Sequence, residues 1–135
     1  MADNYLFVYG TLRRACQQPL FKVLDNHAEF VAEATFQGIL YLLDNYPGVI
    51  ESTEPSDIVY GEVYYLNDVN RLLSTLDEYE ECSLAFPTPT EYQRCKRLVK
   101  LNNQQIIEAW IYLYNRPIGN LPRIKSGDFL DLSCL

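Results

Sequence analysis

Apolar residues occur along this chain mostly in short runs, and residues that favour turns separate the runs. Such a pattern is typical of β-strands. It predicts strands at residues 5–9, 30–36, 38–42, 49–51, 58–66, 91–101 and 105–114. Asn45-Tyr46-Pro47-Gly48 is predicted as a turn between two of them. The last two are expected to form a hairpin across Asn102-Asn103.

Two segments follow a helical pattern instead. Asn67 or Asp68 can cap the clearer helix, whose apolar residues recur at i, i+3, i+4 and i+7: Val69, Leu72, Leu73 and Leu76. A shorter helix is expected around residues 19–24, because Pro is favoured in a first turn. From about residue 116 onward, Pro and Gly recur, so this tail is predicted to be mostly irregular.

The length and composition fit one folded domain. A chain of 135 residues with 48% hydrophobic residues can fill a single core. Many strands, few helices and strand partners that are distant in the sequence predict an α+β fold. We expect a small mixed β-barrel flanked by a few helices, as a single domain over residues 1–135.

The charge and the hydropathy exclude several kinds of partner. The 18 acidic and 11 basic residues give a net charge of −7, which argues against nucleic-acid binding. The N-terminal residues MADN lack the features of a signal peptide, and no apolar run approaches the ~20 residues that span a bilayer. We therefore expect a cytoplasmic protein, either a monomer or a homodimer, that binds neither nucleic acid nor membrane.

The cysteines predict neither a metal site nor a disulfide framework. The four cysteines are far apart and include no CxxC pair: Cys16, Cys82, Cys95 and Cys134. A cysteine hydrolase would also need a histidine to form the thiolate. The sequence has only His27, which has no evident acidic partner. No metal or cofactor is expected.

One acidic residue falls on the apolar face of the clearer helix. At about 100° per residue, Glu80 comes roughly 40° from Leu76, whereas Glu78 comes at roughly 200°, on the outer face. An ionised carboxylate is costly to bury, so it needs a partner, a proton or a function. Near a helix C-terminus we expect its pKa to be raised, which suits a general base. If the helix instead ended at Glu78, Glu80 would turn toward solvent, and periodicity does not decide between the two.

The first predicted strand stops abruptly at Gly10. Thr11 and Leu12 follow, and then come two arginines. This end is either an ordinary turn or a place where backbone N–H groups converge and hold an anion. Glycine would allow close approach and unusual backbone dihedral angles there.

The chain resembles the gamma-glutamylcyclotransferase-like family, also called the AIG2-like family, over most of its length. Eight short motifs occur in the same order as in that family: FVYGTLR at 7–13, GILY at 38–41, YPG at 46–48, VYGEVY at 59–64, LDEYE at 76–80, YQR at 92–94, AWIY at 109–112 and IKSGDF at 124–129. Two positions depart from the family pattern, because Ala15 and Glu81 stand where the family often has glycine.

The resemblance implies a barrel with a cavity at the end of the first strand. It also implies an enzyme that cyclises a gamma-glutamyl group to 5-oxoproline and releases the attached amine. The loop Tyr9-Gly10-Thr11-Leu12 would hold the glutamyl group, and Glu80 would be the catalytic residue. We expect Glu80 to take a proton from the substrate's alpha-amine and give it to the departing nitrogen. Tyr112 is a further candidate for substrate binding.

Two readings remain open at the level of sequence. The first is this enzyme, with a gamma-glutamyl compound of undetermined identity as its small-molecule substrate. The second is a non-catalytic binding or interaction protein that keeps the fold and the cavity, because fold alone does not secure function. Retention of both the YGTL loop and Glu80 favours the enzyme.

Overall fold

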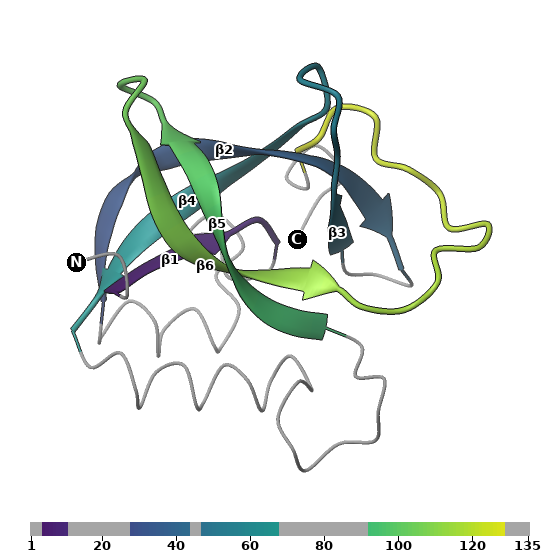
Figure 1. The fold of residues 1–135 in the computed structure, drawn as a ribbon, viewed down its shortest axis with the longest axis horizontal. Helices are drawn as coiled ribbons and strands as arrows, with labels where there is room; N and C mark the ends of the chain where they lie inside the picture. The colour runs from purple at the N-terminus through teal and green to yellow at the C-terminus, as the bar shows by residue number, and fades with distance from the viewer. Residues whose placement is uncertain (1–3, 11–27, 44–46, 68–91, 129–135) are drawn as a thin grey trace, which may run out of the picture.

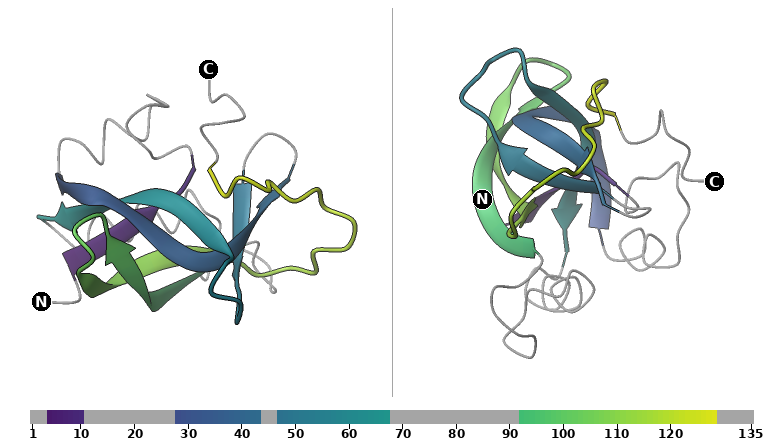
Figure 2. Two further views of the ribbon diagram at one scale, coloured as in Figure 1. Left: turned by 90° about the horizontal axis from the view of Figure 1, so that it is seen from above. Right: turned by 90° about the vertical axis from the view of Figure 1, so that its right-hand side faces the viewer.

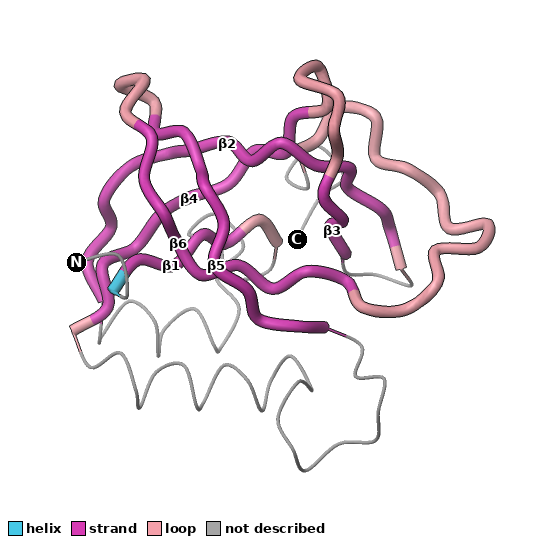
Figure 3. The backbone as a smooth tube through the Cα atoms, in the orientation of Figure 1, coloured by secondary structure: helices cyan, strands magenta, loops and turns pink. Residues whose placement is uncertain are grey.

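The computed structural model describes residues 4–10, 28–43, 47–67 and 92–128. Six strands run through them: β1 (Tyr5–Val8), β2 (Ala28–Leu42), β3 (Pro47–Glu51), β4 (Ile58–Leu66), β5 (Tyr92–Leu101) and β6 (Ile106–Tyr114). Within these ranges there is no α-helix, and the short cyan segment in Figure 3 is a 3₁₀ turn at Asn4, directly before β1. Both predicted helices lie outside the described residues.

Five of the strands close into a barrel (Figure 1). Their order is β2-β4-β1-β6-β5, and β5 pairs again with β2 to complete the ring. Neighbouring strands are antiparallel except β1 and β6, which run parallel with Leu6 opposite Trp110. β3 pairs outside this ring, along the last part of β2. The mixed barrel predicted from the sequence is therefore confirmed, and closure leaves its five strands without a free edge.

β2 is one long strand where the sequence predicted two. It has 15 residues and pairs with β4 as far as Gln37, and then with β3 from Gly38 to Leu42. The predicted break at residue 37 does not occur, and the neighbouring Gly38 is a point of close packing. A Cβ there would lie 2.6 Å from the Ile50 carbonyl oxygen and 2.8 Å from the Phe36 ring. Glycine inside a strand often marks such an approach.

The predicted turn at residues 45–48 is wrong for its second half. Pro47 and Gly48 begin β3 and pair with Leu42 and Tyr41 of β2. Proline is tolerated at the first residue of a strand, where its missing N–H costs least. Pro47 lies against Gly10, two residues after the end of β1.

The barrel interior is filled by alternate residues of its strands. Phe7 stands near its centre, with ring centroids 6.5 Å from Tyr9 and 6.3 Å from Phe36. The other buried members of this core are Ala34, Leu40, Val49, Val59, Val63, Val99, Leu101, Ala109, Ile111, Leu113 and Ile124.

Part of the outer face is buried as well. Leu6, Tyr64 and Leu66 have no exposed surface, although they alternate with the core residues of β1 and β4. The sheet is thus buried on both faces at these two strands. Glu62 lies in the same part of β4 and is the only buried charged residue within the described ranges.

After β6, residues 115–128 cross the far end of the barrel without regular structure, as predicted (Figures 1 and 2). Three backbone hydrogen bonds tie this segment down. The Leu42 amide donates to Pro122, the Ile124 amide to Leu40, and the Tyr60 amide to Gly127, at 2.9, 2.8 and 2.8 Å. Ile124 enters the core. The segment therefore bridges β2 and β4.

Candidate functional site

Tyr9 follows β1 directly and is fixed inside the barrel. Its side chain is buried, and its hydroxyl donates a hydrogen bond of 2.5 Å to the backbone carbonyl of Tyr112 on β6. β1 and β6 are neighbouring parallel strands, so this bond ties their ends together. Two of the residues predicted for the site, Tyr9 and Tyr112, are thereby brought into contact.

Gly10 is buried and packs against Pro47. A Cβ on Gly10 would lie 2.6 Å from Pro47 Cγ and 3.1 Å from Cδ, so a side chain does not fit unless the proline moves. Its φ angle lies outside the left-handed region, which only Gly119 and Gly127 occupy among the described glycines. Gly10 therefore lacks a positive φ, contrary to the expectation of an unusual backbone dihedral angle. Close packing is what makes glycine necessary here.

Pro47 is held in turn by Tyr92 at the start of β5. The Tyr92 hydroxyl donates a 2.6 Å hydrogen bond to the Pro47 carbonyl. The Tyr92 ring also meets Tyr114 edge to face, with centroids 6.0 Å apart. No local signal in the sequence indicated the contact of Tyr92 with Pro47, which is 45 positions away.

Three other predicted site residues, Thr11, Leu12 and Glu80, lie outside the described residues. Their roles, like the departures at Ala15 and Glu81, remain predictions. The structure describes the contacts that hold the chain just before the predicted loop. Gly10 packs against Pro47, the Pro47 carbonyl accepts a hydrogen bond from Tyr92, and the Tyr9 hydroxyl donates one to Tyr112.

Glu62 is a buried acid that the sequence analysis did not single out. It lies opposite Val8 in the β1–β4 pairing, two residues before Gly10. Its carboxylate accepts a hydrogen bond of 3.2 Å from the Tyr64 hydroxyl, and 4% of the residue is exposed. The available signal was a carboxylate inside an otherwise apolar and aromatic strand, Ile58–Leu66.

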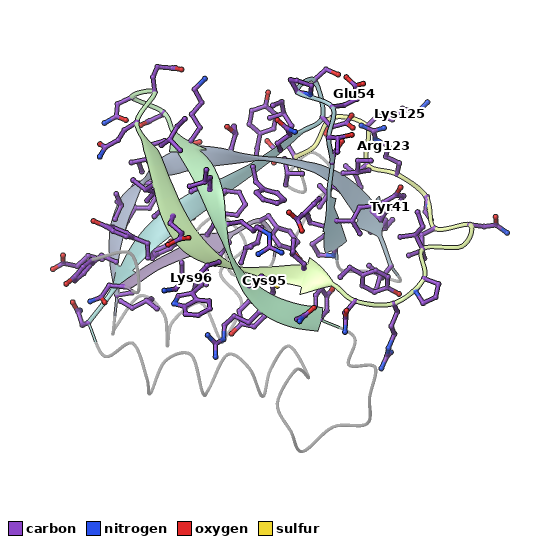
Figure 4. The ribbon with its side chains drawn as sticks, viewed as in Figure 1. Tyr41, Glu54, Cys95, Lys96, Arg123 and Lys125 are labelled. Atoms are coloured by element: carbon purple, nitrogen blue, oxygen red, sulfur yellow. The ribbon has the colours of Figure 1, made fainter. Side chains whose placement is uncertain are left out.

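Trp110 carries two cations on the outer face of the β5–β6 hairpin. The Arg94 guanidinium lies 4.4 Å and the Lys96 ammonium 4.9 Å from the ring centroid. The Trp110 side chain is half-buried. Lys96, on β5, is labelled in Figure 4. Such contacts stabilise a partly exposed ring and its cations by about 0.5–1 kcal/mol each.

A small pocket of about 150 Å³ lies elsewhere, between β2, β4 and the segment at residues 123–127. Arg123 and Lys125 are at its rim, close to Glu54 in Figure 4. The Arg123 guanidinium forms a 2.7 Å ion pair with Asp57. A hydrogen bond from Ser52, and next the Arg123 contact, lower the pKa of the Asp57 carboxyl. No predicted site residue lines this pocket.

In the part of the chain that the structure describes, no three acidic, histidine or cysteine side chains are grouped as a metal site requires. Nor does any helix there have the length and apolar character needed to cross a membrane.

Several known proteins are similar to this chain in sequence and in fold. The sequence model of the family described as gamma-glutamyl cyclotransferase, AIG2-like, matches residues 6–131. The gamma-glutamylcyclotransferase family protein YtfP of Escherichia coli strain K12 is 32% identical over 127 residues, which are 93% of this chain and 96% of YtfP.

Two crystal structures illustrate the shared fold. An AIG2-like protein from Mus musculus has a TM-score of 0.68 at 23% identity, covering 90% of this chain and 86% of the mouse protein. YkqA from Bacillus subtilis has a TM-score of 0.71 at 26% identity and covers 95% of this chain, which spans 40% of YkqA. With a family model over residues 6–131 and a relative matched along nearly its whole length, the chain belongs to the gamma-glutamyl cyclotransferase, AIG2-like family.

Proposed function

We propose that this protein is a gamma-glutamylcyclotransferase, which converts a gamma-glutamyl amine or gamma-glutamyl amino acid to 5-oxoproline and releases the attached amine. The observation that carries the proposal is the rigid end of β1 in a member of this family. Gly10 is pressed against Pro47, and Tyr9 is bonded to Tyr112, so the loop that begins at Thr11 starts from a fixed point.

In the proposed reaction, the substrate's alpha-amine attacks its own gamma-carbonyl carbon. The new C–N bond closes the five-membered ring, and the bond to the departing nitrogen breaks. The ammonium nitrogen loses two protons on becoming the ring N–H: Glu80 accepts one and delivers it to the departing nitrogen, and the other passes to water, so no external oxidant, reductant or metal is needed. Holding the glutamyl chain folded back contributes further, because aligned intramolecular attack is intrinsically fast.

Backbone N–H groups of the loop at Gly10, Thr11 and Leu12 would bind the alpha-carboxylate or the oxyanion that develops on the gamma-carbonyl. Preorganised amides stabilise such charge without cationic side chains. Gly10 is already packed against Pro47, so binding costs little entropy for ordering this residue. We further propose a cytoplasmic monomer or homodimer, which light scattering coupled to size-exclusion chromatography will resolve.

The test is a panel of gamma-glutamyl amines and dipeptides, including glutathione and the gamma-glutamyl-lysine isopeptide, with 5-oxoproline as the measured product. We expect at least one substrate to be turned over. Glu80→Gln should keep the thermal stability of the parent and lose more than about 100-fold in kcat, as expected for a general acid–base residue. Glu78→Gln, predicted on the outer helix face, is the matched control and should keep full activity. No 5-oxoproline from any substrate would favour a non-catalytic binding protein, and an active Glu80→Gln variant would refute the role of Glu80.

A further inference from the structure

Three segments that are far apart in the sequence meet at the end of β1. They are Gly10 after β1, Pro47 at the start of β3 and Tyr92 at the start of β5. β3 pairs with β2 alone, and neither β1 nor β5 is among its partners. The separation of Gly10, Pro47 and Tyr92 is therefore set by side-chain contacts and by the Tyr92 hydrogen bond, not by a ladder between their strands.

The contacts link Tyr92 to Gly10 through Pro47 and leave the proline little room to move. The Tyr92 hydroxyl holds the Pro47 carbonyl at 2.6 Å. The proline ring is stiff and carries the atoms that face Gly10, so a force on the carbonyl reaches the glycine backbone. Tyr92 is 4% exposed, which shields its hydrogen bond from competing water.

A second set of contacts, made by Tyr114, holds the first two residues of β3 as well. The Tyr92 ring packs edge to face on Tyr114, and a Cβ on Gly48 would lie 3.1 Å from Tyr114 Cβ. Gly48 follows Pro47 directly, so Tyr92 and Tyr114 together determine where the first two residues of β3 lie. Neither residue needs to touch the substrate for this purpose.

We propose that Tyr92 is a positioning residue, which acts through Pro47 on Gly10 and so fixes the Gly10 backbone, from which the predicted substrate-binding loop begins. This inference rests on the proposed function for its effect on catalysis, although the contact chain exists without it. Displacement of a binding group by a fraction of an ångström is enough to lower turnover, because catalysis depends on near-attack geometry.

The test uses Tyr92→Phe, which keeps the ring against Tyr114 and removes only the hydroxyl. The matched control is Tyr65→Phe, which removes a hydroxyl that accepts a 3.1 Å hydrogen bond from Asn4 near the start of β1. With a gamma-glutamyl substrate, we expect Tyr92→Phe to lower kcat/KM about tenfold, mainly through kcat. Tyr65→Phe should match the parent. Equal kcat and KM for Tyr92→Phe and the parent would overturn the proposal.

A double-mutant cycle separates positioning from a merely structural role. Gly10→Ala displaces the Pro47 ring directly, and Tyr92→Phe removes the hydrogen bond to the Pro47 carbonyl, so both variants change the position of Pro47. We expect the double variant to lose less activity than the product of the two single losses, because coupled sites are not additive. If the losses multiply, Tyr92 does not act through Gly10.

A readout without catalysis keeps this inference distinct from the proposed function. In two-dimensional ¹⁵N–¹H NMR spectra of the full chain, Tyr92→Phe should move or broaden the Gly10 amide signal, and Tyr65→Phe should leave it in place. If the parent forms no 5-oxoproline but the Gly10 signal responds to Tyr92→Phe, the proposed function fails and the contact chain stands. An unchanged Gly10 signal in Tyr92→Phe overturns the positioning role.

Discussion

Gly10→Ala is the perturbation whose consequence follows most directly from the geometry. The new Cβ would lie 2.6 Å from Pro47 Cγ, whereas ordinary contact between such atoms begins near 3.4 Å, so the proline ring has to recede by roughly 0.8 Å. That movement strains the 2.6 Å hydrogen bond from Tyr92 to the Pro47 carbonyl. Overpacking of this kind costs about 1–3 kcal/mol of folding free energy.

The same shift should cost more in activity than in stability. Misplacement by about 1 Å can lower turnover by roughly 100-fold, so we expect Gly10→Ala to lose one to two orders of magnitude in kcat. Thermal unfolding followed by circular dichroism measures the stability, and 5-oxoproline release measures kcat per folded molecule.

Gly38→Ala is the control, because its Cβ would be equally crowded, 2.6 Å from the Ile50 carbonyl oxygen, but on β2 against β3. It should lower the melting temperature while the folded fraction keeps its kcat. A Gly10→Ala variant as stable and as active as the parent would refute the claim that the contact with Pro47 fixes the loop. Equal losses of kcat in both variants would trace the effect to general destabilisation.

Two further predictions concern the segment that bridges β2 and β4. Hydrogen bonds from Ser52 and Arg123 lower the pKa of Asp57 from its ordinary value of 3.8. The contribution of the ionised Asp57 to folding stability is therefore fully present above pH 3.8 and is lost as the pH falls through the lower folded-state pKa. The stability difference between the parent and Asp57→Asn, from urea unfolding, should therefore be constant at neutral pH and shrink below about pH 4; an unchanged difference there would contradict it. Gly127→Ala places a Cβ 1.9 Å from the Ile58 carbonyl oxygen at a φ of +73°, and we expect a loss of more than about 2 kcal/mol. Gly119→Ala, with φ +50° and open space, should cost only about 1 kcal/mol, and equal costs for the two variants would show that the contact with Ile58 is unimportant.

Local patterns were enough to find most strands. The boundaries of β4 agree exactly with those predicted, and those of β5 and β6 agree within one residue. The hairpin between β5 and β6 was predicted as well, and Gln104 in its turn has a positive φ of 74°. Strand formation and turn formation depend on neighbouring residues, so these features can be inferred from short windows of sequence.

Contacts across the barrel could not be found in this way. A new strand was predicted to begin at Gly38 after a break at residue 37, and Pro47-Gly48 was interpreted as part of a turn, because glycine and proline usually mark such points. Each is a point of close approach that only the folded barrel creates: Gly38 lies against Ile50 of β3, Pro47 against Gly10, and Gly48 against Tyr114 of β6. Likewise Tyr92 differs in no local feature from other strand tyrosines, and its bond to Pro47 spans 45 positions.

The sequence by itself determined the family and the strand-rich class, since eight ordered motifs and the alternation of apolar residues do not depend on the fold being known. The proposed site at Glu80 stays a prediction from those motifs. Only the tertiary structure decided why Gly10 must be glycine, that Glu62 is buried, and that Tyr92 and Pro47 support the end of β1. The physical reason is that alternation and turn propensity are properties of adjacent residues. Steric crowding, burial and hydrogen bonding between residues 37 to 103 positions apart exist only after the barrel has closed.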